Sequence, residues 1–581
     1  MSARPLIGID LGTTNSLVAV FENGAPRLIA NAHGDFLTPS VVGILESGEA
    51  VVGKAARSLA LTHPDRTVAT FKRWMGEDRK VELAGREFTP PELSSLVLRA
   101  LREDAEAELG TPITRVVVTV PAYFNQNQRE ATRQAGELAG LEVERIVNEP
   151  TAAALTYGFH ERQADQKLLV LDLGGGTFDV TVMEIFEGTL EILSTAGESH
   201  LGGEDFTTSL VSHALKELGR ELEYMEFKEP LMVARLREEA ELAKQAIGVQ
   251  DSGELRVPDS KGDVESTAQR ISISAAQFDE LVAPLMERMR APTLRALRDA
   301  ELAPNAIDEV LLIGGATRMP VVRLMASELF GRPPRDAVDP DHAVALGASV
   351  QAALVADDKA VDDLVMTDVC PHTLGVEIVK EFGSRSVDGY FMPVLHRNTT
   401  IPVSREESVH TIADGQTELH IKVYQGEGRR VEENLYLGDL DVKGLPREKR
   451  GLEVCIRFTY DLNGLLEVEA FVPLSKQKFV TVLKSKTKNL SKAEVEASLK
   501  RMQALKYYPR EDLENQRLLT FANAALKEID RFHRAELESC IDQYEQGLHL
   551  NERELFDHVR EQLVMKLSSL DIPYVQGEDV E

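Results

Sequence analysis

One pattern occurs twice in this chain, and it constrains the fold more than any other feature of the sequence. IGIDLGTTNS at residues 7–16 recurs as LVLDLGGGTFDV at residues 169–180: an apolar strand, Asp-Leu-Gly, a turn of small or hydroxyl residues, and a second strand. Two Ala-rich segments, NEPTAAALTYG at 148–158 and DPDHAVALGAS at 339–349, also resemble each other and are typical of close-packed helices. This internal repeat predicts two similar lobes that face each other across a cleft.

The spacing of apolar residues then divides the chain. To about residue 355, short apolar runs such as VVVTV, LLVLDL and VLLIGG alternate with helical segments, as in an α/β domain. From Cys370 to Thr487 apolar and polar residues alternate, and Asn463-Gly464 predicts a hairpin turn between two alternating runs. This middle part is therefore expected to be all-β.

The last part of the chain has a helical period. Ser491 and Glu494 form a capping box ahead of an apolar stripe at Val495, Leu499, Met502 and Leu505. We therefore expect an α/β domain at 1–358, a linker at 359–369, an all-β domain at 370–488, and helices with a solvated tail at 489–581.

The linker contains the apolar sequence VDDLVMTDV at residues 361–369. It could be an edge strand that places Leu364 and Met366 in the adjacent core. It could instead be a docking segment that is buried in one state and exposed in another. The sequence favours neither interpretation.

Both Asp-Leu-Gly turns carry groups that suit an anion. Gly12 and Gly174–Gly176 lack a Cβ, so their backbone N–H groups can approach a phosphate closely. Thr13, Thr14 and Thr177 add hydroxyl donors. One such turn would be an ordinary glycine turn, but the repeated pattern favours two hairpins that hold a polyphosphate. The P-loop sequence GxxxxGK[ST] is missing, which excludes that class of ATPase.

Three carboxylates accompany these turns. Asp10, Asp172 and Asp179 would repel phosphate directly, so they make sense only through a cation or ordered water. We therefore expect Mg²⁺ among them.

A third glycine turn, GGATRMP at residues 314–320, follows the apolar run VLLI and opens a helix. Its position suits backbone contact with a nucleoside, and Arg318 could offer a flat cationic face to a base. The alternative is a strand-to-helix turn without a ligand.

Composition excludes several classes of partner. Asp and Glu number 95 against 65 Lys and Arg, a formal net charge of −30. Nucleic acid and anionic membrane surfaces repel such a chain, so we expect neither as a partner. No apolar run reaches the ~18 residues of a membrane span, and the first ten residues have no secretory apolar region. Three distant cysteines, Cys370, Cys455 and Cys540, suit a reducing cytoplasm.

Six segments resemble one known family in order along the chain. GIDLGTTNS, VTVPAYFNQNQREAT, VNEPTAAAL, LDLGGGTFDVTV, LGGEDF and IGGATRMP are similar to the nucleotide-binding domain of the seventy-kilodalton heat-shock chaperones, the DnaK type. NTTIPVSR and YQGEGRRV resemble that family's peptide-binding sandwich. Within the family, TDVCPHTLGVE and ALKYYPREDL look most like the specialised bacterial HscC members.

The resemblance implies an α/β actin-like two-lobed ATPase domain, an all-β sandwich that grips extended apolar peptide, and a short α-helical lid. It implies catalytic roles for Lys72, Glu149, Asp179 and Thr177, and metal ligands at Asp10, Asp172 and Asp179. It implies contacts with ATP or ADP at Gly12, Thr13, Thr14, Asn15, Gly174, Gly175, Gly176, Gly202, Gly203, Glu204, Glu241, Lys244, Gly314, Gly315, Arg318 and Asp341. As bare sequence, Lys72 beside Arg73 would be a solvated helix face.

The resemblance further implies a peptide groove and a route between the domains. The groove residues are Leu374, Val376, Val379, His410, Ala413, Leu419 and Ile421, and the alternative for such strand residues is an ordinary core. The residues that would report the nucleotide state are Pro121, Tyr123, Arg129 and Leu364, and the alternative for Pro121 is a strand terminator.

The sequence departs from the family at the adenosine end of the site. Gln245 replaces an arginine, and Gly248 and Ala316 replace serines. In the groove, His410 replaces a phenylalanine, and the terminus GEDVE lacks the EEVD ending. The changes at the adenosine end predict weaker nucleotide binding and independence from a dedicated nucleotide exchange factor. Those in the groove and at the terminus argue against broad client use and against docking of the usual tail-binding partners.

The implied function is an ATP-driven chaperone with slow hydrolysis, stimulated by a J-domain co-chaperone, with client polypeptides as partners and K⁺ beside Mg²⁺. Two other functions share the hairpins: an actin-like filament or scaffold protein, and a sugar or acetate kinase. The first has no use for a linker and groove domain. For the second, no general-base aspartate with a carbon-substrate pocket is evident.

Overall fold

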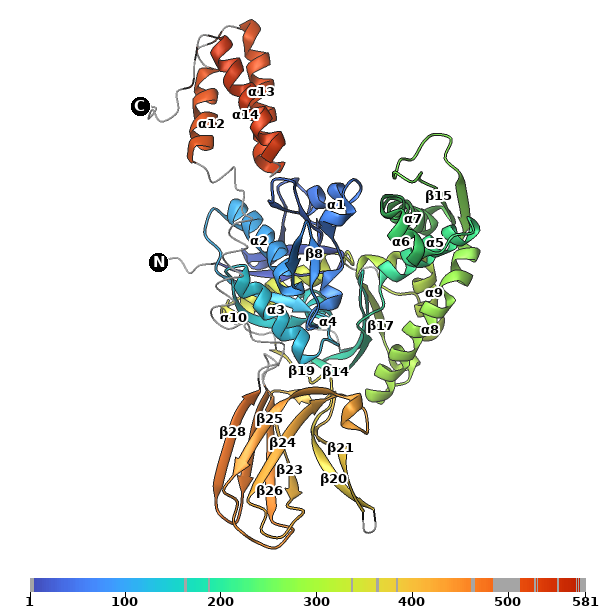
Figure 1. Ribbon diagram of the computed structural model, residues 1–581, viewed down its shortest axis with the longest axis vertical. Helices are drawn as coiled ribbons and strands as arrows, with labels where there is room; N and C mark the ends of the chain where they lie inside the picture. Colours follow the sequence, from blue (N-terminus) through green and yellow to red (C-terminus); the bar gives the residue numbers. More distant parts are fainter. Residues whose placement is uncertain are drawn as a thin grey trace.

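The computed structural model shows two lobes, a β-sandwich beneath them and a group of helices near the C-terminus (Figure 1). It describes residues 5–160, 165–186, 189–335, 338–361, 365–382, 385–460, 466–483, 513–526, 529, 531–550, 553–570, 572 and 574. No helix in this described part is long and apolar enough to cross a membrane.

The first lobe is built on a mixed sheet with the strand order β11-β10-β1-β2-β3. The strand β1 pairs in parallel with β10 and forms an antiparallel hairpin with β2. The strands are β1 (Leu6–Asp10), β2 (Asn15–Glu22), β3 (Ala25–Ile29), β10 (Arg115–Val120) and β11 (Glu142–Asn148). Their apolar side chains form one buried core with the helix α2 (Pro90–Leu109).

The second lobe repeats this arrangement with the strand order β17-β12-β13-β14-β18. The strand β12 pairs in parallel with β17 and forms an antiparallel hairpin with β13, as β1 does with β10 and β2. The strands are β12 (Gln166–Leu173), β13 (Phe178–Phe186), β14 (Thr189–Glu198), β17 (Glu309–Ile313) and β18 (Val365–Met366). The repeat in the sequence is therefore a repeat in the fold.

Two helices pack between the sheets, α4 (Glu149–His160) and α10 (Ala343–Val355). They carry the two similar Ala-rich segments, and their small side chains share one buried cluster with residues of both sheets. Gly347 shows how closely they approach, because a Cβ at this position would lie 1.6 Å from the carbonyl oxygen of Ala152. The predicted close packing is present.

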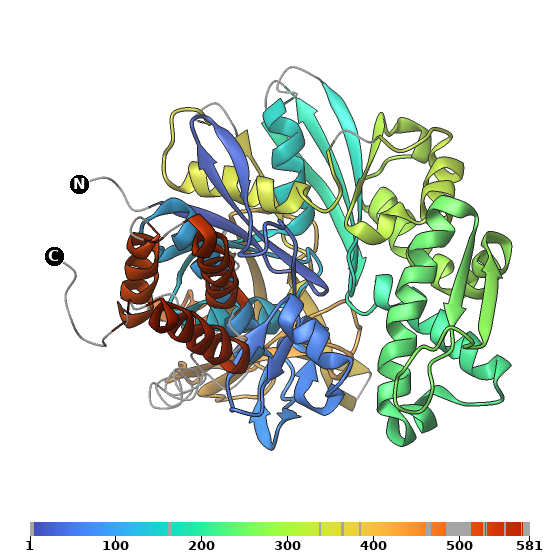
Figure 2. The same ribbon diagram turned by 90° about the horizontal axis from the view of Figure 1, so that it is seen from above.

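Smaller elements extend both lobes, which lie on opposite sides of the molecule in Figure 2. The first lobe adds β4 (Thr38–Pro39), β5 (Val42–Ile44), β6 (Ala50–Val52), α1 (Lys54–Ala60), β7 (Thr67–Val68), the 3-10 helix η2 (Phe71–Trp74), β8 (Val81–Leu83), β9 (Arg86–Phe88) and α3 (Gln126–Leu138). The second lobe adds α5 (Gly203–Glu217), α6 (Leu222–Lys228), α7 (Pro230–Gln250), β15 (Ser252–Arg256), β16 (Arg270–Ser274), α8 (Ala275–Asp299), the 3-10 helix η4 (Gly315–Arg318) and α9 (Pro320–Phe330).

The linker lies against the second lobe. Its strand β18 pairs in parallel with β14, with Val365 opposite Thr189 and Met366 opposite Leu190. Met366 packs against two apolar clusters between the lobes. The segment is thus an edge strand in this structure, while Leu364 lies outside the described residues.

The sandwich consists of two four-stranded antiparallel sheets, β21-β20-β24-β25 and β23-β26-β27-β28, which share one apolar core. The strands are β20 (Leu374–Phe382), β21 (Arg385–Leu395), β23 (Val403–His410), β24 (Glu418–Gln425), β25 (Leu435–Lys443), β26 (Glu453–Tyr460), β27 (Leu466–Val472) and β28 (Gln477–Leu483). The expected hairpin is present as the antiparallel pair of β26 and β27, although its turn, Asn463-Gly464, lies outside the described residues. A short pair, β19 (Asp368–Val369) with β22 (Thr400–Ile401), joins the linker to the sandwich.

In the described residues after the sandwich there are three helices, α12 (Leu513–Ala525), α13 (Arg531–Leu550) and α14 (Arg553–Ser569). They bury their own apolar cluster around Leu537 and Tyr544. The predicted capping box and the apolar stripe that follows it lie outside the described residues.

Replacing Gly347 with alanine tests the contact between α4 and α10. The added methyl group forces the helices apart, and overpacking of this kind costs about 1–3 kcal/mol. We expect calorimetry to show a fall of roughly 2–10 °C in the melting temperature of the two-lobed domain. Gly248→Ala is the matched control, because this glycine of α7 has no neighbouring atom closer than 3.8 Å to a new Cβ. Alanine there should stabilise its helix slightly, and equal effects of both substitutions would contradict the close packing.

Candidate functional site

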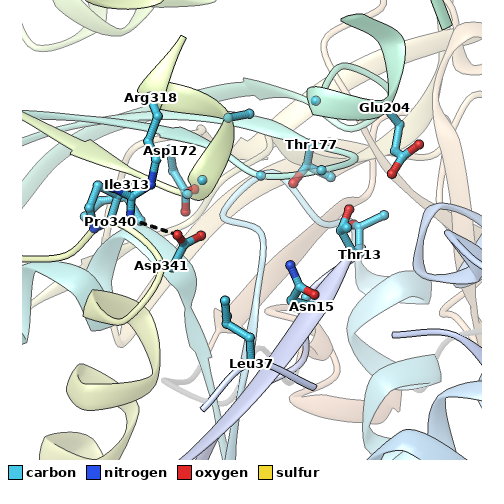
Figure 3. A pocket seen from close by; sticks show the side chains of 18 of the residues that line it. Thr13, Asn15, Leu37, Asp172, Thr177, Glu204, Ile313, Arg318, Pro340 and Asp341 are labelled. Atoms are coloured by element: carbon cyan, nitrogen blue, oxygen red, sulfur yellow. Dashed lines mark hydrogen bonds and ion pairs between the residues drawn. The ribbon is translucent and has the colours of Figure 1, made fainter. Parts of the chain in front are cut away.

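A cavity of about 560 Å³ lies between the lobes. The Asp-Leu-Gly turn of each lobe lines it, together with η2, α5, α7 and the third glycine turn. Figure 3 shows Thr13 and Asn15 from the first lobe opposite Thr177 and Glu204 from the second. Of the residues that the sequence predicts for nucleotide, metal or catalysis, Gly176, Gly202 and Asp179 do not line this cavity.

The two turns come close to each other at Gly175. A Cβ at this position would lie 1.7 Å from Thr14 Oγ1 of the opposite lobe, so only glycine allows the approach. Gly202 packs behind the same turn, where a Cβ would lie 2.4 Å from the Gly175 carbonyl carbon. Thr14 Oγ1 is buried and has no hydrogen-bond partner among the described residues. The two turns therefore offer a free hydroxyl group, and their glycines have no side chains that would block a phosphate.

Asp172 and Asp179 are buried beside the turns, and Asp10 is half-buried. Burial, followed by the negative charge of Glu149, raises the pKa of Asp10 to about 7. Burial and Glu149 also raise the pKa of Asp179 to about 7, although backbone N–H groups of Ala122 and Tyr123 donate hydrogen bonds to it.

The pKa of Asp172 is raised for the same reasons. Burial, Glu149 and the other aspartates raise its pKa well above the ordinary value. Its Oδ2 atom has no hydrogen-bond partner in the part of the chain that the structure describes. Oxygen ligands of this kind suit a hard divalent cation, so the cluster fits Mg²⁺.

Lys72 brings a positive charge to this cluster. Its Nζ atom lies 2.5 Å from Glu149 Oε1, and both side chains are buried. The ammonium also lies 5.7 Å from the centre of the Phe124 ring. A solvated helix face is therefore excluded for Lys72.

An ion pair across the cleft was not predicted from the sequence. Arg73 of η2 donates to Asp205 of α5 at 2.5 Å and to the Gly175 carbonyl at 3.4 Å. These contacts join the lobes beside the cavity. Arg73 lies in the segment TFKRWMG and Asp205 in the segment LGGEDF, and nothing in either segment indicates that the two residues meet.

The end of the cavity that the sequence predicts for adenosine is lined by α7 and the third glycine turn. Glu241 accepts hydrogen bonds from Thr207 at 2.7 Å and from Gln245 at 3.1 Å, and it pairs with Lys244 at 2.7 Å. Burial alone would raise the pKa of Glu241, but Lys244 and these hydrogen bonds hold it below its ordinary value.

The glycine turn presents Arg318, whose guanidinium lies 2.6 Å from Asp339 and 3.0 Å from Asp341. Gly248 and Ala316 line the same end without polar side-chain atoms. Leu37 and Val249 also line the cavity, and sequence reasoning missed them.

Tyr123 and Arg129, two of the residues predicted to connect the domains, lie between the cavity and the sandwich. Tyr123, in the turn that follows Pro121, donates its backbone N–H to Asp179 at 3.2 Å. Arg129 of α3 donates to Asn148 Oδ1 at 2.6 Å, and Asn148 donates to Asp368 of β19 at 3.0 Å.

A second contact joins the lobes to the sandwich. Arg397 pairs with Asp299 of α8 at 2.9 Å, and the backbone N–H of Thr195 donates to Asn398 at 3.0 Å. The sandwich is thus docked on both lobes.

The predicted groove residues fall into two sets. Leu374, Val376 and Ile421 are buried in the sandwich core, with Leu419 packed against it. Val379 is half-buried on β20, while His410 and Ala413 are exposed. The structure therefore brings the first four together and leaves the other three outside the core.

Comparison with known proteins agrees with this architecture. The family model "Hsp70 protein" matches residues 6–82 and 78–571. The chaperone protein DnaK of Thermotoga neapolitana is 43% identical over 475 residues, which cover 80% of this chain and 78% of that protein. The DnaK protein of Thermotoga maritima is similar to the same extent, at 43% identity with 80% and 78% covered. The HscC subgroup stays a prediction, but the chain belongs to the Hsp70 family.

Proposed function

We propose that the two lobes form an actin-like ATPase whose nucleotide state controls how the sandwich binds and releases extended apolar polypeptides. The observation that carries this proposal is the double hairpin around a buried carboxylate cluster, which hydrogen bonds connect to the docked sandwich. As a member of the Hsp70 family, the chain is an ATP-dependent chaperone. Family membership leaves the filament and sugar kinase alternatives without support.

The residues around the cavity take distinct roles in hydrolysis. Thr13, Thr14 and the glycine turns hold the phosphates, and Asp10, Asp172 and Asp179 would hold Mg²⁺, with K⁺ as a further ion. The chemistry that bound magnesium supplies is neutralisation of charge on the phosphate oxygens. Lys72 orients the attacking water and stabilises the charge that develops on the γ-phosphoryl oxygens, while Thr177 and Glu149 position the same water.

Lys72→Ala should reduce the single-turnover rate of ATP hydrolysis at least about 100-fold, with ATP affinity largely kept. The lysine acts on charge that develops in the transition state, so its loss falls on the rate. Quench-flow kinetics and calorimetry measure the two quantities. Lys80→Ala is the control, because Lys80 forms an exposed pair with Glu87. Hydrolysis by Lys72→Ala at the wild-type rate would refute this role.

The linker is proposed to transmit the nucleotide state. With β18 paired to β14, the sandwich is held against the lobes, and loss of this pair would free it. Leu364 was predicted to be the centre of this coupling, and it lies outside the described residues. Met366 can be tested in its place, because its side chain packs against the apolar clusters between the lobes.

Met366→Asp should uncouple the domains. A carboxylate in this apolar environment loses hydration without gaining a partner, which disfavours docking. We expect basal ATPase activity to stay within about twofold of wild type, while ATP-triggered release of a fluorescent apolar peptide fails. Met366→Leu keeps an apolar side chain of similar size and should release peptide normally. Normal release by Met366→Asp would show that this strand is only an idle edge of the sheet.

The adenosine end of the site suggests an unusual nucleotide cycle. Gln245 cannot supply the cation that an arginine would, and Gly248 and Ala316 supply no hydroxyl. We propose that ADP dissociates fast enough for the chaperone to cycle without a dedicated exchange factor. The proposed partners are client polypeptides and a J-domain co-chaperone. We propose neither nucleic acid nor a membrane as a partner. The proposed location is the cytoplasm.

We expect the dissociation constant for ADP to be roughly 10- to 100-fold above the family norm, because a stacked guanidinium contributes ~0.5–2 kcal/mol and each hydroxyl bond ~0.5–1.5 kcal/mol. Calorimetry on wild type and on Gln245→Arg with Ala316→Ser tests this directly. The double substitution should tighten ADP binding at least about tenfold. An unchanged dissociation constant would remove the physical basis for exchange-factor independence.

A further inference from the structure

One histidine links the sandwich to the nucleotide cavity. His372 follows β19 and precedes β20, and it is 8% exposed in the interface between the sandwich and the lobes. Its Nε2 atom lies 3.0 Å from the carbonyl oxygen of Tyr123. A carbonyl oxygen only accepts, so Nε2 carries the hydrogen and donates it.

Tyr123 connects this contact with the carboxylate cluster. Its carbonyl accepts from His372, while its backbone N–H donates to Asp179 at 3.2 Å. The Tyr123 and His372 rings are also in contact, with centroids 4.3 Å apart. A single residue of the first lobe is therefore held from one side by the sandwich and from the other by the cluster.

We propose that His372 is a positioning residue that couples docking of the sandwich to Asp179 through Tyr123. It does so only in its neutral form, and the inference rests on the proposed function. Docking then depends on protons as well as on nucleotide. His372 itself lies at the interface and does not line the cavity.

The surroundings of His372 disfavour a charged imidazole. Arg129 of α3 and Arg295 of α8 face it from the lobes, and Arg295 stacks on the Tyr123 ring at 5.5 Å. Glu427, after β24, is the opposing negative charge, and it is engaged by Arg397 and Thr373. Burial, with further contributions from the two arginines, lowers the pKa of His372 to about 4.

The sign of the pH dependence follows from this shift. A histidine exposed to water has a pKa of about 6.5, so the undocked state binds a proton more readily than the docked state. Docking is therefore fully favoured above pH 7 and weakens as the pH falls through 6.5 toward 4. Between pH 7.5 and 5.5, a docked pKa of about 4 predicts a fall of roughly tenfold in the docking equilibrium.

Hydrogen exchange of the full chain in saturating ATP and Mg²⁺ measures docking directly. We expect the protection factors of the β18 and β19 amides, corrected for intrinsic exchange, to fall about tenfold from pH 7.5 to 5.5. His372→Gln keeps an N–H donor for the Tyr123 carbonyl but does not titrate. It should retain protection near the wild-type value at pH 7.5 and lose this pH dependence.

His372→Leu keeps the packing and removes the donor. Because the Tyr123 carbonyl then lacks its partner in the interface, protection should fall at least about fivefold at pH 7.5 and be insensitive to pH. A wild-type pH dependence in His372→Gln would overturn the proposal and assign the effect to other groups, such as Asp368, whose pKa burial also raises.

A double-mutant cycle tests the link to the cluster. If Tyr123 carries the coupling, His372→Leu and Asp179→Asn should change β18 protection non-additively, by at least about threefold. Additive effects would overturn the coupling to Asp179. If ATP gives wild type no protection of β18 at pH 7.5, the proposed nucleotide control of docking fails, and the role of His372 fails with it.

Discussion

The nucleotide site depends on an imbalance of buried charge. Asp172, Asp179 and Glu149 are buried and Asp10 is half-buried around the ammonium of Lys72, which lies against Glu149. Buried carboxylates without compensating cations are costly, and the raised pKa values of the aspartates express that cost. A bound cation removes it. Because Asp10 comes from the first lobe and Asp172 and Asp179 from the second, a cation bound by all three would hold the lobes together.

Backbone groups, as well as side chains, connect the carboxylate cluster to the sandwich. The turn after β10 supplies N–H groups to Asp179 on one side and a carbonyl to the sandwich on the other. The N–H and the carbonyl of Tyr123 belong to two planar peptide groups that share one Cα, so very little backbone separates Asp179 from the sandwich contact. The neighbouring path through Arg129 and Asn148 ends on Asp368, which begins the sandwich side of the linker.

Much of this architecture could be predicted because its signals are local. The two Asp-Leu-Gly hairpins, the close helices α4 and α10 and the alternating strands of the sandwich each follow from spacing within a short window. The pair of Arg73 and Asp205 could not be predicted, since 132 residues separate them and both could be solvated surface charges. The sequence did not decide whether the linker forms a strand, because β18 has two residues and an alternation of apolar and polar side chains cannot be recognised over so short a length. His372 was noticed only as part of a subgroup pattern, since its partner lies 249 residues away.

The parallel pairing of β18 with β14 means that the second lobe's sheet is completed by a strand from outside the lobe. β14 has ten residues, and β18 covers only Thr189 and Leu190 at its beginning. So short a ladder forms few hydrogen bonds and can separate without disturbing the core behind it. When it separates, the start of β14 at Thr189 and Leu190 becomes a free edge whose N–H and C=O groups can pair with another extended chain. In a protein that binds unfolded polypeptides, such an edge would offer them a second place to pair, and β18 covers it while the two strands are paired.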